Sequence, residues 1–417
     1  MKINNIYKKL IKEDYYLIII FLVMTITIIS KSYFNPSGYL SPDSIYYLSL
    51  AQNLLDNYSF YIYGPNKKIE LFAVWPVGYP FLIFMTAKIT GLSVFLASKL
   101  LNIFFIGLIL FFFRKLFNKN AYLYGLIFLF ASLIQIYTYS WSESVFIFCL
   151  LWFSTSIYLL LTKTKKNALV YSSILFSSLF LFLSRYIGAF SFGLIGLLGL
   201  YYFFIKKDKS KSLILISIAL INLSLMSIYL HHNFIISGYI TGLPRYFAPE
   251  TNIHLLEMLI KSIILEILFY SNHVIWKDIA FPLFQFILFI LLFLKYRKFI
   301  IKQYTNKQLM ILPIVFSSIG IVYLFFMVLL SWNGYIEELN YRLLAPGSFL
   351  IFIAMINYFE NHSRAKYFNL FKILFVAVSM YSWVLNVPYQ ILKDIKNPNY
   401  EKINNFNIKY TYFKKID

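Results

Sequence analysis

Eleven long apolar runs constrain this chain more than any other feature of its sequence. A helix that crosses a bilayer needs about 20 mostly apolar residues, and each run approaches that length. The chain is 60% hydrophobic and only 13% charged, against about 25% charged residues in soluble domains. We therefore predict an all-α polytopic membrane protein with about 11 transmembrane helices. The runs cover residues 15–31, 93–113, 120–138, 143–162, 168–184, 187–205, 212–230, 279–294, 309–330, 343–358 and 367–386.

The basic residues predict how the chain is oriented. The net charge is +21, yet the lysines and arginines are not pooled in one soluble patch, so no nucleic-acid partner is expected. They form short clusters between alternate pairs of runs, and the positive-inside rule places such clusters in the cytoplasm. Lysines also precede the first run, which has no small-residue cleavage site after it and is interpreted as an uncleaved span. We expect an integral, multi-pass protein of a bacterial inner (plasma) membrane.

The segments between the other pairs of runs hold nearly all of the unusual polar residues and are expected outside the cell. They are residues 32–92, 139–142, 185–186, 231–278 and 331–342. We expect residues 1–386 to form one transmembrane domain, and residues 387–417 to form a short tail that also lies outside. An amphipathic stretch at about 254–270 falls in the second long segment.

Two short helices are predicted in the first outer segment. Ser41 is a good N-cap, Pro42 suits the first helical position, and apolar residues then recur with helical spacing up to Leu55. We expect this helix to lie on the membrane surface. A second short helix, at about 80–90, is expected to end at Gly91.

Two acids stand where apolar runs meet outer segments. Asp43 lies in the first turn of the predicted surface helix, where a carboxylate complements the helix dipole. Its functional interpretation is a general base that accepts a proton from an attacking hydroxyl. Glu143 opens the fourth run, and an ionised side chain costs roughly 2.5–3.5 kcal/mol at the centre of a span and less near the interface. Glu143 is either an interface acid or a residue that binds acceptor hydroxyls or holds Arg185.

Two arginines lie on the side that the positive-inside rule disfavours. Arg185 separates the fifth and sixth runs, and Arg342 opens the tenth. Either is explained by simple anchoring at the interface. An anionic ligand explains both, because a guanidinium binds phosphate through paired hydrogen bonds. We expect Asp43, Glu143 and Arg342 to line one outer cavity.

The sequence gives little support for a metal or a nucleotide. His231, His232, His254 and His273 share one outer segment, but their spacing matches no familiar zinc pattern. Cys149 is the single cysteine, so it has no partner for an intrachain disulfide. Walker and dinucleotide-binding glycine motifs are absent, which leaves ATP-driven transport without support. We expect neither a metal nor a cofactor.

Five short motifs occur in a fixed order on the predicted outer face. They are Pro42-Asp43-Ser44-x-x-Tyr47-x-x-x-Ala51, Pro76-x-Gly78-Tyr79-Pro80, Glu143 at the opening of a span, Ser184-Arg185, and Tyr341-Arg342-Leu343-Leu344-x-Pro346. Over residues 1–360 the chain resembles the membrane glycosyltransferases of the GT-C class. The most similar groups are the protein O-mannosyltransferases, the bacterial aminoarabinose transferases and the rhizobial lipopolysaccharide sugar transferases.

The resemblance implies a GT-C-like bundle and a polyprenyl-phosphate-linked sugar as donor. It implies inverting transfer on the extracytoplasmic face to the hydroxyl of a lipid, glycan or protein, with Asp43 as the base. Many members have a second acid where Ser44 stands, and many have a soluble domain after the last span, for which the tail is too short. We assign donor-phosphate binding to Arg342 and Arg185, and acceptor binding or support to Glu143 and Tyr47.

Three other functions stay open from the sequence. A transporter or flippase for a lipid-linked glycan predicts charged residues near the middle of the bilayer, often in paired halves. A polysaccharide polymerase or ligase predicts key residues in a large late loop, for which residues 231–278 are available. A catalytically inactive scaffold predicts no particular pattern. The placement of acids and arginines at span ends favours a transferase over a transporter.

Overall fold

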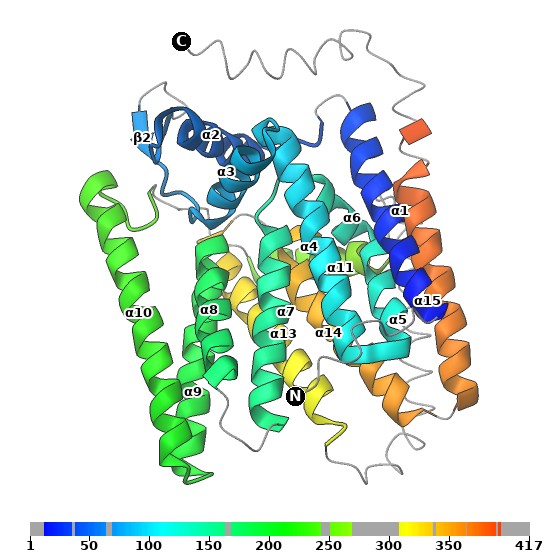
Figure 1. Ribbon diagram of the computed structural model, residues 1–417. Coiled ribbons are helices and arrows are strands. Elements are labelled where there is room, and N and C mark those ends of the chain that lie inside the picture. Colours follow the sequence, from blue (N-terminus) through cyan, green and yellow to red (C-terminus); the bar gives the residue numbers. More distant parts are fainter. Residues whose placement is uncertain are drawn as a thin grey trace, which may run out of the picture.

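The computed structural model shows a bundle of long helices with shorter helices at one end (Figure 1). It describes residues 12–35, 38–63, 69–162, 168–242, 251–268, 308–336, 339–363, 365–388 and 391–392. Within these residues, eight helices are long and apolar enough to cross a membrane, which confirms the all-α membrane class. These eight spans contain α1 (Lys12–Phe34), α4 (Val94–Phe117), α7 (Glu143–Thr162), α9 (Phe190–Phe204), α10 (Lys209–Ser237), α13 (Ile311–Trp332), α14 (Tyr341–His362) and α15 (Ala365–Asn386), and α8 (Ala168–Ser184) is a shorter apolar helix beside them.

The difference between eight described spans and eleven predicted runs has three causes. Helix α8 is apolar but has 17 residues and is short for a full span. The predicted run 279–294 lies outside the described residues. The third cause is the run at 120–138, which is helical but broken.

The run at 120–138 crosses the bundle from one end to the other as several short helical segments. It consists of α5 (Ala121–Gly125), the 3₁₀ turn η2 (Leu126–Leu129) and α6 (Ala131–Thr138), with the extended residue Phe130 before α6. Asn120, at its start, donates a 2.7 Å hydrogen bond to Glu360 near the end of α14. Tyr139, at its end, packs against Tyr39 shortly before α2. We call these two ends of the bundle the Glu360 end and the Asp43 end.

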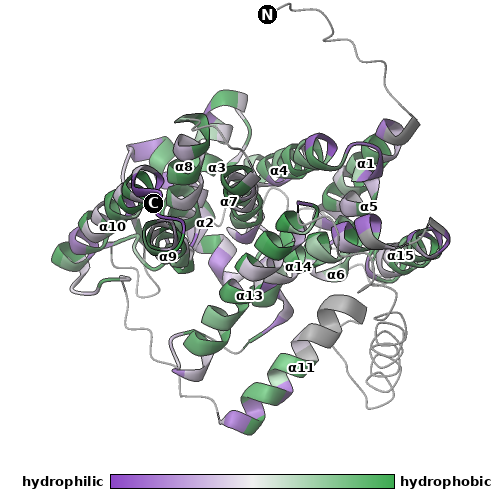
Figure 2. Ribbon diagram, turned by 90° about the horizontal axis from the view of Figure 1, so that it is seen from below, coloured by the Kyte–Doolittle hydropathy of each residue, from purple (hydrophilic) through white to green (hydrophobic). Residues whose placement is uncertain are grey.

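The outer surface of the bundle suits a lipid environment. Large apolar side chains such as Leu213, Phe104 and Phe325 are more than half exposed, and extensive apolar exposure marks contact with a membrane or with another protein. Figure 2, which views the bundle from below, shows hydrophobic residues on the long helices. Helix α11 (Asn252–Leu268) confirms the amphipathic stretch predicted near 254–270, and it packs against α13 and α14.

The first outer segment folds as the sequence predicts, with two helices at the Asp43 end. Helix α2 (Pro42–Asn57) begins after Ser41, whose side chain accepts a 3.2 Å hydrogen bond from the Ser44 backbone N–H. Strands β1 (Tyr61–Tyr63) and β2 (Ile69–Leu71) follow and pair antiparallel. Helix α3 (Gly78–Thr90) ends at Gly91, which adopts the left-handed conformation that favours glycine. The position of α2 on the membrane surface stays a prediction.

Close packing fixes the first outer segment against the end of α8. A Cβ atom at Gly78 would overlap the carbonyl oxygen of Leu183, so a larger residue does not fit there without displacement of the backbone. The Tyr186 hydroxyl donates a 2.7 Å hydrogen bond to the Ala73 carbonyl. These contacts flank Arg185 and hold it beside the first outer segment.

The second long outer segment, predicted at 231–278, differs from expectation at its start. Helix α10 continues to Ser237, so His231 and His232 are helical residues and not loop residues. Residues 243–250 and 269–278 lie outside the described part of the chain, as does nearly all of the tail predicted at 387–417.

Candidate active site

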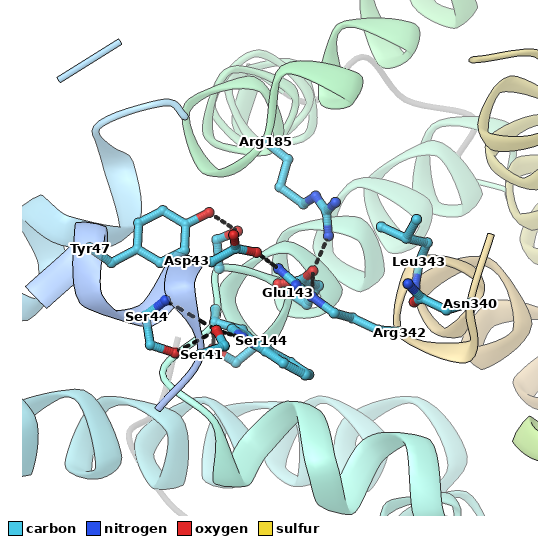
Figure 3. Close-up of polar contacts among 12 residues, drawn as sticks. Ser41, Asp43, Ser44, Tyr47, Glu143, Ser144, Arg185, Asn340, Arg342 and Leu343 are labelled. Atoms are coloured by element: carbon cyan, nitrogen blue, oxygen red, sulfur yellow. Dashed lines mark hydrogen bonds and ion pairs between the residues drawn. The ribbon is translucent and has the colours of Figure 1, made fainter. Parts of the chain in front are cut away.

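Four charged residues from distant parts of the chain meet at the Asp43 end. Arg342 Nη2 lies 2.6 Å from Asp43 Oδ2, and Arg342 Nε lies 2.5 Å from Glu143 Oε1. Arg185 forms an ion pair through Nη1 with the same Glu143 oxygen (Figure 3). The structure thus brings together the two acids and two arginines that the sequence singles out, and it places Arg342 between the acids.

Each of the four residues is held by the start or end of a helix. Asp43 is the second residue of α2, and Glu143 is the first residue of α7. Arg342 is the second residue of α14, whose N-cap Asn340 accepts a 3.1 Å hydrogen bond from the Leu343 backbone N–H. Both acids therefore lie at helix N-termini, where the helix dipole favours a negative charge. Arg185 has an extended backbone directly after α8.

Burial separates the two acids by role. The Glu143 side chain has no exposed surface, whereas the Asp43 side chain is 20% exposed. Burying an unpaired carboxylate is costly, and the two arginines at Glu143 Oε1 offset this cost. Glu143 Oε2 is also buried and has no hydrogen-bond partner among the described residues. Glu143 is thus placed to hold the arginines, and Asp43 is the acid that a substrate reaches more easily.

Trp141 contacts this cluster from two sides, although the sequence interpretation did not single it out. The Arg342 Cζ atom lies 4.1 Å from the centroid of the Trp141 ring, which is a cation–π contact. The indole N–H donates a 2.6 Å hydrogen bond to Ser41 Oγ, at the N-cap of the helix that carries Asp43. A tryptophan among small polar residues at the opening of an apolar run is the signal in the sequence that points to it.

Tyr47 is a buried neighbour of the site. Its hydroxyl lies 3.1 Å from Ser142 Oγ, and its ring packs edge-on against Tyr79. Burial raises the pKa of Tyr47 well above its usual value, and the negative charges of Asp43 and Glu143 raise this pKa further. Tyr47 therefore stays neutral at physiological pH. With no exposed surface, it is placed to support the site from behind.

Polar side chains of α4 hold the turn between α6 and α7 from behind the site. Asn102 Nδ2 donates hydrogen bonds of 2.9 and 2.8 Å to the carbonyls of Tyr137 and Tyr139. Lys99 Nζ donates one of 2.5 Å to the Thr138 carbonyl. These contacts fix the backbone that carries Trp141 and Glu143. Their signal in the sequence is a lysine and an asparagine inside the apolar run 93–113.

The histidines that suggested a metal site do not form one in the described part of the chain. No group of three or more His, Cys, Asp or Glu side chains with the geometry to hold a metal ion occurs among these residues. His231, His232 and His254 are described, and His273 is not.

Comparisons with known proteins give two similar solved structures. No protein-family model and no curated protein matches the chain. The first structure is a crystal structure of ArnT from Cupriavidus metallidurans bound to undecaprenyl phosphate, at 12% identity and a TM-score of 0.49. Its alignment covers 83% of this chain and 58% of that chain, so the present chain spans less than two thirds of its length. The second is the same protein in the apo state, at 10% identity and a TM-score of 0.39, covering 90% of this chain and 77% of that chain.

ArnT is an aminoarabinose transferase of the GT-C class, which is the class that the sequence motifs resemble. With identities of 12% and 10% and TM-scores below 0.5, this likeness by itself assigns neither a family nor an activity to the chain.

Proposed function

We propose that this protein is a membrane glycosyltransferase that moves a sugar from a polyprenyl-phosphate carrier to an acceptor hydroxyl, with inversion at the anomeric carbon. The acceptor is a lipid, a glycan or a protein. The observation that supports this most directly is the contact of Arg342 with both Asp43 and Glu143. A side chain suited to bind phosphate therefore lies beside one suited to accept a proton, at one end of an apolar bundle.

The proposed reaction is a single displacement. Asp43 accepts the proton of the acceptor hydroxyl while the hydroxyl oxygen forms a bond to the anomeric carbon. The bond between that carbon and the phosphate oxygen breaks, and its electron pair leaves with the polyprenyl phosphate. Attack on the face opposite the phosphate inverts the anomeric centre.

The arginines supply the electrostatic part of this proposal. Arg342 and Arg185 offset the negative charge that the phosphate gains as it leaves, and charge stabilisation of this kind often contributes more to catalysis than any other single effect. The contacts of Arg342 with Asp43 and Glu143 use two of the five N–H donors of a guanidinium. The Nη1 side of the guanidinium is where a phosphate would bind.

The distribution of basic residues supports a site that faces outside. Arg114, Lys115 and Lys119 lie at the Glu360 end, where α4 stops, and Lys206 and Lys207 lie just after α9 stops at that end. The positive-inside rule places such residues in the cytoplasm. The Asp43 end would then meet the outer leaflet of the plasma membrane, where a lipid-linked sugar presents its phosphate.

The first experiment identifies the substrates. A strain that lacks this protein is compared with its parent by mass spectrometry of surface glycolipids, glycans and glycoproteins. We expect one sugar to be missing from one class of acceptor, and the gene restored on a plasmid should return it. A complete surface profile in the deletion strain, with donor lipid at its normal level, would contradict the proposal.

The second experiment tests the base. Asp43→Asn keeps the size of the side chain and removes its ability to accept a proton, so we expect turnover to fall by about 10²- to 10⁴-fold. Asp56→Asn is the matched control, because Asp56 lies on the same helix, is exposed and accepts hydrogen bonds from Gln52. Turnover is measured in membranes as formation of the product that the deletion strain lacks. Equal turnover in the two folded variants would remove Asp43 from the mechanism.

The same deletion strain separates the alternatives. If the protein is a flippase, its deletion would leave the lipid-linked glycan on the inner leaflet. The Asp43→Asn variant would still transport the glycan, because transport needs no proton acceptor at position 43. A polymerase or ligase would leave the repeating unit intact but unjoined. The meeting of the acids and arginines at one end of the bundle favours transfer at the interface over passage through the membrane.

A further inference from the structure

We infer that Trp141 is a positioning residue that holds the phosphate-binding arginine and the helix of the base in one fixed arrangement. The inference rests on the proposed function, because it assigns Trp141 a task in the same site. Trp141 lies in the turn between α6 and α7, is 6% exposed and carries no charge. Its contribution is therefore made through Arg342 and Ser41 and not by contact with a reacting atom.

The indole ring is enclosed between a cation and a second aromatic ring. Arg342 Cζ lies 4.1 Å from its centroid, and the Tyr139 ring stacks on it at 4.0 Å with an interplanar angle of 4°. Two groups at this distance do not fit on one face of an indole, so they occupy opposite faces. Arg342 is thereby held against a flat, rigid surface, with two of its N–H groups directed at the carboxylates.

The edge of the same ring reaches the helix of the base. The indole N–H donates to Ser41 Oγ at 2.6 Å, and Ser41 Oγ also accepts from the Ser44 backbone N–H. Asp43 lies between these two serines on α2. One rigid side chain thus fixes the start of α2 relative to the guanidinium, which sets the separation of proton acceptor and phosphate site.

The stack continues away from the site to a second cation. Tyr139 packs edge-on against Tyr39 at 5.0 Å, and Lys31 Nζ lies 4.9 Å from the centroid of the Tyr39 ring. Lys31 is 4% exposed and donates to the Asn386 carbonyl at the end of α15. This succession of rings supports the Trp141 face opposite Arg342, so the indole has little room to move away from the guanidinium.

The chain offers a matched control on α7. The indole N–H of Trp152 donates to Ser173 Oγ at 2.6 Å, which is the bond length found at Trp141. The rings near Trp152 are Phe148 and Phe180, and its site lies away from the four charged residues. Substitutions at Trp152 therefore report the cost of losing an indole and its hydrogen bond without disturbing Arg342.

The first test is binding of undecaprenyl phosphate to the full-length protein in phosphatidylcholine nanodiscs. Trp141→Leu removes the ring that holds Arg342, and we expect roughly tenfold weaker binding. Trp152→Leu should bind as the wild type does. In an Arg342→Ala background, Trp141→Leu should have no further effect, because a positioning residue acts only through the group it positions.

The second test is turnover. Trp141→Phe keeps an aromatic ring under Arg342 but loses the N–H to Ser41, so binding should stay within about twofold while turnover falls about three- to tenfold. Trp152→Phe should leave both unchanged. This separation of binding from turnover is not expected from a residue that only stabilises the fold, and Trp141→Phe decides the question if Trp141→Leu does not fold.

Wild-type binding in Trp141→Leu, or wild-type turnover in Trp141→Phe, would overturn the inference. So would equal losses at Trp152, or losses that add to those of Arg342→Ala. Asp43→Asn distinguishes this failure from a wrong function. If Asp43→Asn is inactive and the Trp141 variants are normal, only the positioning role is wrong; if Asp43→Asn is fully active, the proposed mechanism is wrong.

Discussion

The two ends of the bundle use arginine in different ways. At the Glu360 end, Arg114 directs Nε and Nη2 at the two oxygens of one carboxylate, Asp14. At the Asp43 end, Arg342 directs the same two nitrogens at two different carboxylates, Asp43 and Glu143. The Arg114 guanidinium binds both oxygens of Asp14 and joins α1 to α4. The Arg342 guanidinium binds one oxygen of each of two acids, so it contacts only one oxygen of either carboxylate.

Glu360 and Glu143, one at each end, also differ in how fully their oxygens are hydrogen-bonded. Glu360 accepts hydrogen bonds from Asn120 on one oxygen and from the Tyr124 hydroxyl on the other, both at 2.7 Å. Glu143 instead receives two arginines on one oxygen, and its other oxygen has no partner among the described residues. Both carboxylate oxygens of Glu360 are therefore hydrogen-bonded within the protein. At the Asp43 end, a ligand can compete for hydrogen bonds with the arginines and acids.

Neutralising Glu143, which is fully buried, and Glu360, which is partly buried, should test this comparison most clearly. Glu143→Gln leaves two arginines without their shared carboxylate, so we expect about 3–5 kcal/mol lower stability and at least 100-fold lower turnover. Glu360→Gln weakens or reverses one of two hydrogen bonds that come from neutral donors, and we expect about 1–2 kcal/mol lower stability with normal turnover. Thermal unfolding in detergent and product formation in membranes measure the two effects. Similar turnover losses in both variants would show that the two ends do not differ.

Removal of the two arginines gives the next largest effect. Arg342→Ala should weaken binding of undecaprenyl phosphate by roughly 10- to 100-fold, because charge-assisted hydrogen bonds to the phosphate are lost. Arg114→Ala breaks a partly exposed pair, so it should lower stability by about 1 kcal/mol or less and leave binding unchanged. Binding is measured in nanodiscs. The dependence of turnover on donor concentration and on acceptor concentration is a second readout. An unchanged donor dependence in Arg342→Ala would contradict its assignment.

A smaller effect is expected from Arg185→Lys, which sharpens the comparison within the Asp43 end. Lysine keeps the charge beside Glu143 but loses the planar fork, so we expect turnover to fall about three- to tenfold. Lys211→Arg is the control, since it pairs with Asp208 at the opposite end of the bundle and should be neutral. If Arg185→Lys lowered turnover more than Arg342→Ala does, Arg185 and not Arg342 would be the main phosphate-binding residue.

The smallest effect is expected at Tyr47. Tyr47→Phe removes one hydroxyl contact with Ser142, so turnover should fall by no more than about fivefold. Since the pKa of Tyr47 is raised, its phenol stays protonated through pH 7–10, and the pH profile of turnover in that range should match the wild type. An alkaline limb that disappears in Tyr47→Phe would show that the tyrosine ionises during turnover.

Some of this fold follows from local sequence, and some does not. The helix after Ser41 and the stop at Gly91 were predictable because capping depends on a few adjacent residues. The break at Phe130 was not, because neither glycine nor proline stands at that position and the residues directly before it are apolar. Tertiary packing against α1, α4 and α14 decides the shape of that segment.

The same division applies to the site. Asp43, Glu143, Arg185 and Arg342 stand out in the sequence because charge at the end of an apolar run is costly and needs an explanation. The sequence does not show that one arginine bridges both acids, since its partners lie 299 and 199 residues away. Trp141 was missed because aromatic residues are common in this chain and only its contacts distinguish it.

The bridge made by Arg342 also bears on biogenesis. Asp43 is made early in synthesis, and the arginine that reaches it is made 299 residues later, at the start of α14. Before α14 is made, the proposed donor-binding arginine is missing, so a nascent chain would bind lipid-linked sugar weakly. Full activity of the proposed enzyme would thus require nearly the whole chain, and an incomplete copy would compete poorly for lipid-linked sugar.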